Sequence, residues 1–118
     1  MEPKNIIEAS LPEELHSWFE TNHSTCREMW VRTNRGNRQV DGTIRYVDSV
    51  MEALCFGWID STIKKVDDGF PLQRFTPRRK GSHWTELNRE RCRQLIAEGR
   101  MTESGLIEYE KSYEQETE

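Results

Sequence analysis

The stretch that decides the fold is Trp58-Ile-Asp-Ser-Thr-Ile-Lys-Lys-Val-Asp-Asp-Gly-Phe-Pro-Leu-Gln-Arg-Phe-Thr76. Its two ends, Trp58–Val66 and Leu72–Thr76, contain β-branched and aromatic side chains of the kind that favours strands. Between them, Asp67-Asp-Gly69 is typical of a hairpin turn, because glycine adopts the backbone angles that a tight turn requires. The stretch therefore predicts two consecutive strands joined as a β-hairpin.

Three helices are predicted around this hairpin. Ser10-Leu-Pro-Glu13 has capping-box spacing with an early proline and opens the first helix. The apolar stripe of this helix consists of Leu11, Leu15, Trp18 and Phe19. Thr43 is the expected cap of a second helix, and Gly57 is its expected C-terminal stop. The third helix is expected to start near Ser82–Thr85 and to run to Gly99.

Glu28–Thr33 alternates well enough to predict one more strand, which gives the order α-β-α-β-β-α. This order predicts a single α+β domain over residues 1–107, with the helices packed on one face of a small, mostly antiparallel sheet. Residues 108–118 are Glu-rich, and we expect them to form a disordered acidic tail; the alternative is that Leu106, Ile107 and Tyr109 dock this segment on the domain.

The net charge of −4 conceals an uneven distribution of charge. Residues 61–100 carry ten Lys and Arg against five Asp and Glu, whereas residues 101–118 carry six Glu against one Lys. The basic middle of the chain favours an anionic partner, and the acidic end would solvate or shield that surface. The alternative is that these charges form ordinary solvated faces.

The chain lacks the usual signals for metals, disulfides and membranes. Its three cysteines have no CxxC spacing, and its three histidines have no metal-site spacing, so neither a disulfide framework nor a zinc site is predicted. It shows no leader and no apolar run of about 18 residues, so we expect no membrane insertion, a cytoplasmic location and no cofactor.

The loop from Arg74 to Trp84 leads directly into the third helix, whose first N–H groups lack partners within the helix. Arg78, Arg79 and Lys80, with the hydroxyls of Ser82 and Thr85, would complete a cradle for a phosphate, a nucleotide or a carboxylate. The simpler alternative is a capped helix with exposed arginines. No glycine-rich phosphate loop supports the anion interpretation.

The third helix should bury the side that carries Trp84, Asn88, Arg91, Cys92 and Leu95. Buried amide and guanidinium groups need partners, so we expect Asp60 to pair with Arg91 and backbone carbonyls to serve Asn88. One interpretation is a polar brace between helix and sheet; the other is a pocket beside Trp58 and Trp84. The predicted ligand-binding residues are Trp58, Asp60, Arg74, Arg78, Arg79, Ser82, Trp84, Asn88 and Arg91.

Familiar catalytic motifs such as GxSxG, HExxH and the Walker sequence are missing. Asp60, behind Trp58, is a candidate general base, and His83 is a candidate acid or base at the helix start. An aspartate in this position more often pairs with an arginine or caps a turn. Cys55, between two apolar residues, is expected to be a small core residue rather than a nucleophile.

The chain resembles the YdeI/OmpD-associated family, also labelled bacteriocin-protection proteins. The resemblance begins in Tyr46–Ser61 and continues through Arg74–Arg79 and Ser82–Asn88 to Leu95–Met101 and Gly105-Leu106. It covers residues 13–107. The family's characteristic motif positions correspond here to Gly57, Trp58, Asp60, Ser61, Arg74, Phe75, Pro77, Arg78, Ser82, Trp84 and Asn88. The resemblance implies a small bacterial protein associated with an outer-membrane porin and with protection against bacteriocins, and it supplies no catalytic residues.

Three hypotheses about function follow. The first is a non-catalytic stress or bacteriocin-protection protein that binds an anionic small molecule, or a protein partner, in a Trp/Arg pocket. The second is a module for single-stranded nucleic acid, in which basic residues contact phosphates and aromatic rings stack on bases; the negative net charge disfavours it. The third is a small enzyme that uses Asp60 or His83.

Overall fold

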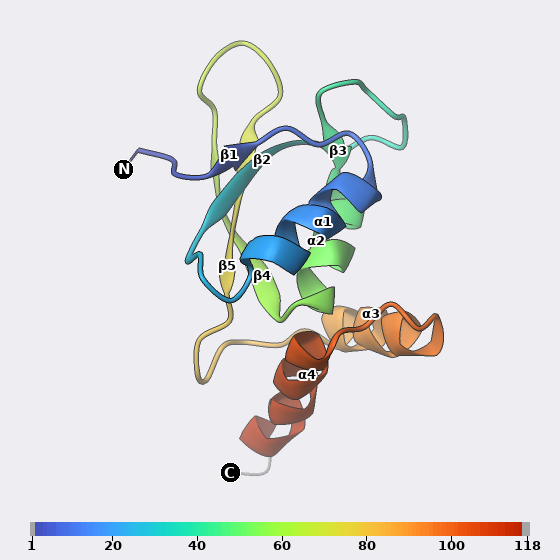
Figure 1. Ribbon diagram of the computed structural model, residues 1–118. Coiled ribbons are helices and arrows are strands. Elements are labelled where there is room, and N and C mark those ends of the chain that lie inside the picture. Colours follow the sequence, from blue (N-terminus) through green and yellow to red (C-terminus); the bar gives the residue numbers. More distant parts are fainter. Residues whose placement is uncertain (1, 117–118) are drawn as a thin grey trace.

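The computed structural model describes residues 2–116 and places a mixed sheet against four helices (Figure 1). In chain order the elements are β1 (Ile6–Ile7), α1 (Pro12–Asn22), β2 (Met29–Asn34), β3 (Ile44–Arg45), α2 (Tyr46–Cys55), β4 (Trp58–Lys64), β5 (Leu72–Pro77), α3 (Glu86–Ala97) and α4 (Glu103–Glu116). The predicted α+β class is confirmed.

The predicted hairpin forms the antiparallel pair β4–β5, in which Trp58 lies opposite Pro77 and Lys64 opposite Leu72. The other edge of β5 pairs antiparallel with β2, while β1 and β3 each add a two-residue parallel pairing to β2. The sheet is therefore mostly antiparallel, as expected. The expected order omits β1 and β3, because a two-residue strand leaves no periodic pattern in a sequence.

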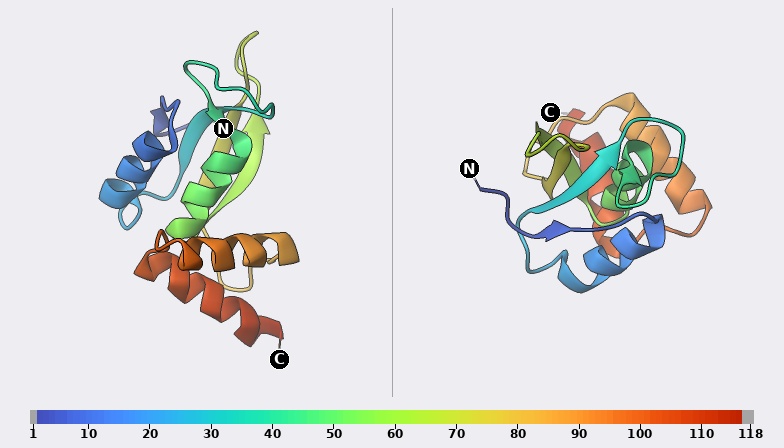
Figure 2. Two further views of the ribbon diagram at one scale, coloured as in Figure 1. Left: turned by 90° about the vertical axis from the view of Figure 1, so that its right-hand side faces the viewer. Right: turned by 90° about the horizontal axis from the view of Figure 1, so that it is seen from above.

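Helices α1 and α2 cover one face of the sheet, whereas α3 and α4 lie at one end of it (Figures 1 and 2). The expectation that all helices cover one face is thus correct only for α1 and α2. The aromatic part of the core lies between α1, the end of α2 and β4. There, Phe19 stacks on Phe56 with ring centroids 5.5 Å apart and meets Trp58 edge-on at 5.2 Å. These contacts fix the start of β4 against both helices.

Two helix starts differ from the prediction, because other groups use the expected capping side chains. Ser10 Oγ accepts the N–H of Gly42, so α1 begins at Pro12 with Leu11 as its N-cap. Glu14, rather than the predicted Glu13, accepts the N–H groups of Ser10 and Leu11. Thr43 Oγ1 donates to the carbonyl of Val40, so the N-cap of α2 is Arg45, two residues later, and the helix begins at Tyr46. The predicted C-terminal stop is confirmed, since Gly57 follows α2 with a φ of +77°.

The expected disordered tail is wrong for residues 108–116, which belong to α4, so the predicted domain boundary at 107 falls inside a helix. Thr102 N–H donates to the carbonyl of Cys55 at 3.2 Å and fixes the start of α4 against the end of α2. Further along, Arg89 Nη2 donates to the carbonyl of Ser112, which is fully buried. Tertiary contacts therefore order this Glu-rich segment. Residues 117–118 of the predicted tail lie outside the described residues.

None of the helices within residues 2–116 combines the length and the apolar character that crossing a membrane requires.

Candidate functional site

A cavity of about 230 Å³, here called the Arg78 cleft, opens where the end of α1, the start of β4, the end of β5 and α4 meet. It is lined by His23, Phe56, Gly57, Trp58, Pro77, Arg78, Ser104, Ile107 and Glu108. Segments from four parts of the chain build it, so its shape depends on the whole fold.

Arg78 is the buried cation of this cleft. Its backbone N–H donates to the carbonyl of Gly57 at 3.1 Å, which continues the β4–β5 pairing by one residue. Its Nη1 donates to Ser82 Oγ and to the carbonyl of His83, each at 3.2 Å. The guanidinium carbon lies 3.6 Å from the centre of the Trp84 ring. Only 8% of the residue is exposed. The loop before α3 therefore holds one side of the guanidinium in place.

The opposite side of the guanidinium is unsatisfied. The Nε and Nη2 atoms of Arg78 are buried, and neither has a hydrogen-bond partner among the described residues. This Nε–H and Nη2–H edge has the geometry that grips both oxygens of a carboxylate or a phosphate. Burial lowers the pKa of Arg78 to about 10, while the negative charges of Glu108 and Asp60 act to raise it. Arg78 is therefore cationic at neutral pH.

His23 and Ser104 form a polar pair at the wall of the same cleft. His23 Nδ1 lies 2.8 Å from the carbonyl oxygen of Phe19, and its Nε2 lies 3.1 Å from Ser104 Oγ. A carbonyl only accepts, so in the neutral imidazole the proton sits on Nδ1 and Nε2 accepts from the serine hydroxyl. The pair joins the end of α1 to the first turn of α4.

Of the predicted ligand-binding residues, four gather at this place. Trp58 and Arg78 line the cleft, and Ser82 and Trp84 hold the guanidinium. Trp58 and Trp84 are 1% and 9% exposed, so they act as walls and supports rather than as open stacking surfaces.

The other predicted residues lie elsewhere. Arg79 is exposed on the loop. Arg74 precedes Phe75 on β5 and so points to the opposite face of the sheet, where its Nε lies 3.3 Å from Glu28 Oε2. Asp60 accepts a 2.6 Å hydrogen bond from the hydroxyl of Tyr46.

Asn88 and Arg91 pair with each other instead of with the partners predicted for them. Arg91 Nη1 donates to Asn88 Oδ1 at 3.0 Å. Both residues are partly exposed, which makes this pair a local contact along α3. The start of α3 is capped internally, because Thr85 Oγ1 accepts the N–H of Asn88. That cap satisfies one of the N–H groups that an anion cradle would need.

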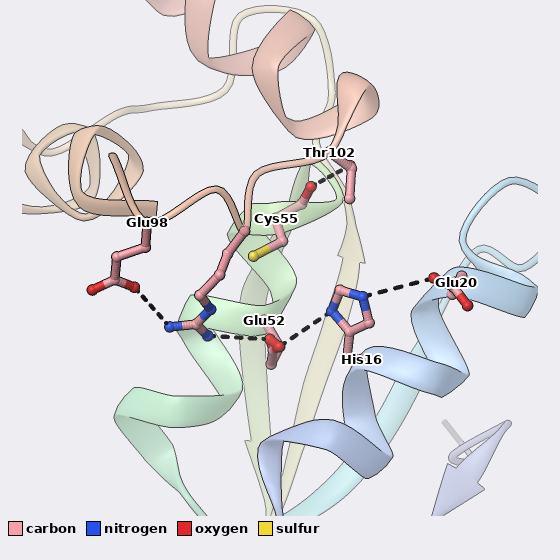
Figure 3. Close-up of polar contacts among 7 residues, drawn as sticks. His16, Glu20, Glu52, Cys55, Glu98 and Thr102 are labelled. Atoms are coloured by element: carbon pink, nitrogen blue, oxygen red, sulfur yellow. Dashed lines mark hydrogen bonds and ion pairs between the residues drawn. The ribbon is translucent and has the colours of Figure 1, made fainter. Parts of the chain in front are cut away.

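A second polar cluster joins α1, α2 and the residues that follow α3 (Figure 3). Glu52 has a side chain that is 4% exposed, and it lies 3.3 Å from His16 Nδ1 and 3.4 Å from Arg100 Nη2. Glu20 and Glu98 continue the cluster outward, so acidic and basic side chains alternate from α1 to the residues that follow α3. The buried carboxylate has partners on both sides, and the cluster therefore acts as a tie between helices.

Sequence reasoning identified neither His23–Ser104 nor the Glu52 cluster. His23 and Ser104 are separated by 81 positions, and Glu52 and Arg100 by 48, so no local spacing relates them. Within residues 2–116, no group of three His, Cys, Asp or Glu side chains is arranged to hold a metal ion. Cys55 and Cys92 are buried, and burial raises their pKa values to about 12 and about 11.

No curated protein and no solved structure matches the chain. A family model matches residues 7–108, and this segment includes every residue that lines the Arg78 cleft. By this match the chain belongs to the family described as a domain of unknown function, DUF8412.

Proposed function

We propose that the protein is a non-catalytic binding module that holds the anionic group of a small ligand in the Arg78 cleft. The observation that carries the proposal is the buried guanidinium of Arg78, whose Nε and Nη2 have no hydrogen-bond partner within residues 2–116. An unsatisfied buried donor costs about 1–3 kcal/mol, and more when the group is charged. An anion bound at this edge would accept hydrogen bonds from both nitrogens and recover that energy, which favours anion binding in the cleft.

The anchoring of Arg78 supports the same proposal. Ser82 and the carbonyl of His83 hold Nη1, and the Trp84 ring supports one face of the guanidinium. The group is therefore fixed before a ligand arrives, which reduces the entropy lost on binding. Binding still requires some movement, because a ligand must displace whichever side chain covers the two buried nitrogens.

The tryptophans disfavour single-stranded nucleic acid as the ligand. Stacking of bases requires open ring faces. Trp30, Trp58 and Trp84 are 2%, 1% and 9% exposed, and the fourth tryptophan, Trp18, is half-buried with its ring edge-on to Trp58. Arg79 and Lys80 are exposed and could contact phosphates, but the tryptophan of the same loop, Trp84, is too buried for a base to stack on it.

The resemblance to the YdeI/OmpD-associated family gives the proposal a biological setting. We propose that ligand binding by the Arg78 cleft serves a stress response or protection against bacteriocins in the cytoplasm. Bacterial survival after bacteriocin treatment, compared between the wild type and a variant that cannot bind its ligand, tests this role.

The binding proposal itself is tested by NMR titration with acetate and with inorganic phosphate. We expect the Arg78 Nε–H signal and the Trp84 indole signal to shift together with one saturable anion. Arg78→Lys keeps the charge but loses the two parallel N–H donors of the guanidinium, so it should weaken anion binding about tenfold or more. Arg79→Lys is the matched control and should bind like the wild type.

Two results would overturn the proposal: no saturable shift with any anion, or a crystal structure grown with the anion in which only ordered water contacts Arg78 Nε and Nη2.

A further inference from the structure

The charges that line the Arg78 cleft limit the charge of its ligand. Among its lining residues, Arg78 carries the one fixed positive charge and Glu108 the one fixed negative charge. A phosphate group carries between one and two negative charges at neutral pH, and it would leave an excess of negative charge beside Glu108. A carboxylate carries a single charge and matches the Arg78 edge in shape. The cleft thus favours a carboxylate.

Glu108 supplies a second recognition point, on the α4 side of the cleft. Its Cγ packs against Gly57, at 2.8 Å from the position that a Cβ on that glycine would take. Its carboxylate is bound by Lys111 Nζ at 3.4 Å. The lysine is 55% exposed, and an exposed pair of this kind contributes at most about 1 kcal/mol. A cationic group of the ligand can therefore replace Lys111 at low cost.

The space between the two charges is small and partly apolar. Its volume of about 230 Å³ lies below the roughly 300–1,000 Å³ of pockets that take drug-sized molecules. Phe56, Pro77 and Ile107 contribute apolar surface to the wall. A ligand of amino-acid size suits this space, with its two charged groups close together and an aliphatic side chain against the apolar wall.

We infer that the ligand of the Arg78 cleft is a small zwitterion of the amino-acid type, with its carboxylate on Arg78 and its ammonium group on Glu108. This inference rests on the proposed function and adds the ligand class and the role of Glu108. The exposed fraction of Ile107 is 45%, so this side chain is free to move aside when the ligand enters.

The test uses three probes that share one aliphatic chain: leucine, isocaproate, which lacks the amine, and isoamylamine, which lacks the carboxylate. Binding to the full chain is measured by NMR titration and calorimetry. We expect leucine to bind about tenfold more tightly than isocaproate, because one charge-assisted hydrogen bond is lost. Isoamylamine should not bind measurably.

Glu108→Gln should reduce the affinity for leucine to that for isocaproate and should leave the affinity for isocaproate unchanged. Glu110→Gln, an exposed position on the same helix, is the matched control. Glutamine has nearly the shape of glutamate and keeps the packing of the residue 108 side chain on Gly57, so both variants should fold, and circular dichroism checks this directly.

The outcomes separate the inference from the proposed function. If isocaproate or phosphate binds as tightly as leucine and Glu108→Gln changes nothing, the zwitterion inference is wrong while the anion site stands. If leucine, isocaproate, acetate and phosphate all fail to shift the Arg78 signals, both are wrong.

Discussion

The guanidinium carbon of Arg78 lies over the Trp84 ring, 3.6 Å from its centre, and this contact joins the end of β5 to the loop that enters α3. A cation–π contact shielded from water contributes about 2 kcal/mol. It offsets only part of the cost of burying a guanidinium whose Nε and Nη2 find no partner in the part of the chain that the structure describes. The chain thus keeps a charged group where an apolar one would suit the fold alone.

Arg78→Met tests whether this charge serves binding or stability. Methionine keeps the contact with Trp84 and removes the buried charge, although it also frees the carbonyl of His83. We expect the free energy of unfolding to stay within about 1 kcal/mol of the wild type, while anion binding is lost. Urea denaturation followed by tryptophan fluorescence, together with the NMR titration, measures both quantities.

The exposed neighbour is the control: Arg79→Met should change neither stability nor binding. A loss of more than about 3 kcal/mol in Arg78→Met would instead identify the residue as a structural brace.

Gly105 sets how closely α4 approaches α2. A Cβ at this position would lie 2.4 Å from the carbonyl oxygen of Cys55 and 2.6 Å from that of Leu54. Both are backbone atoms, so Gly105→Ala should force α4 outward and cost about 1–3 kcal/mol of unfolding free energy. Gly36→Ala is the matched control, because its Cβ would meet only Asn34 Oδ1, at an ordinary 3.7 Å. Equal stability of the two variants in urea denaturation would contradict the docking of α4.

The hairpin and the helices α2 and α3 were predictable because their signals are local: the Asp-Asp-Gly turn at 67–69, the stop at Gly57 and the start near Thr85. Helix α4 was missed because its sequence is Glu-rich and its order comes from distant contacts such as Arg89 with Ser112. Patterns of charge and hydrophobicity along a chain do not report such contacts.

The site shows the same division. The cluster of arginine and tryptophan around Arg78 was visible because both residues lie in one loop. Its second wall was not, since His23 and Glu108 reach the cleft from opposite ends of the chain. Arg74 does not belong to the site, because side chains alternate between the two faces along β5. Its side chain lies on the other face of the sheet, where it pairs with Glu28.

Glu28 should make the protein less stable in acid. Its carboxylate accepts a 2.6 Å hydrogen bond from Trp30 Nε1 and also contacts Arg74, and these two interactions lower its pKa below the usual 4.5. A carboxyl with a lowered pKa contributes its full stability above pH 4.5 and loses it as the pH falls through the lowered value. Glu28→Gln should therefore be less stable than the wild type at pH 7, by about 1 kcal/mol, and the two should converge in acid.

Urea denaturation of both proteins at a series of pH values from neutral to acidic measures this difference. The exposed Glu8→Gln is the control and should follow the wild type throughout. A constant difference between Glu28→Gln and the wild type at every pH would show that the ionised carboxylate is not the source of the effect.

The Glu52 cluster offers a measurable coupling between helices. Removing Arg100 leaves the buried carboxylate of Glu52 with the His16 imidazole as its remaining neighbour in the cluster. Breaking a fully buried pair costs about 3–5 kcal/mol, and because the Arg100 side chain is 41% exposed we expect about 2 kcal/mol for Arg100→Met. In a Glu52→Gln background the same change should cost less, with a coupling energy of about 1–2 kcal/mol.

A double-mutant cycle measured by urea denaturation gives this coupling directly. The matched control is Arg93→Met with Glu86→Gln, an ion pair at 2.6 Å whose side chains are 45% and 70% exposed. Solvent screens that pair, so its coupling should be at most about 0.5 kcal/mol despite the shorter distance. If the two cycles gave the same coupling, burial of Glu52 would not strengthen its pairing with Arg100, and the cluster would not act as a tie between α2 and the end of α3.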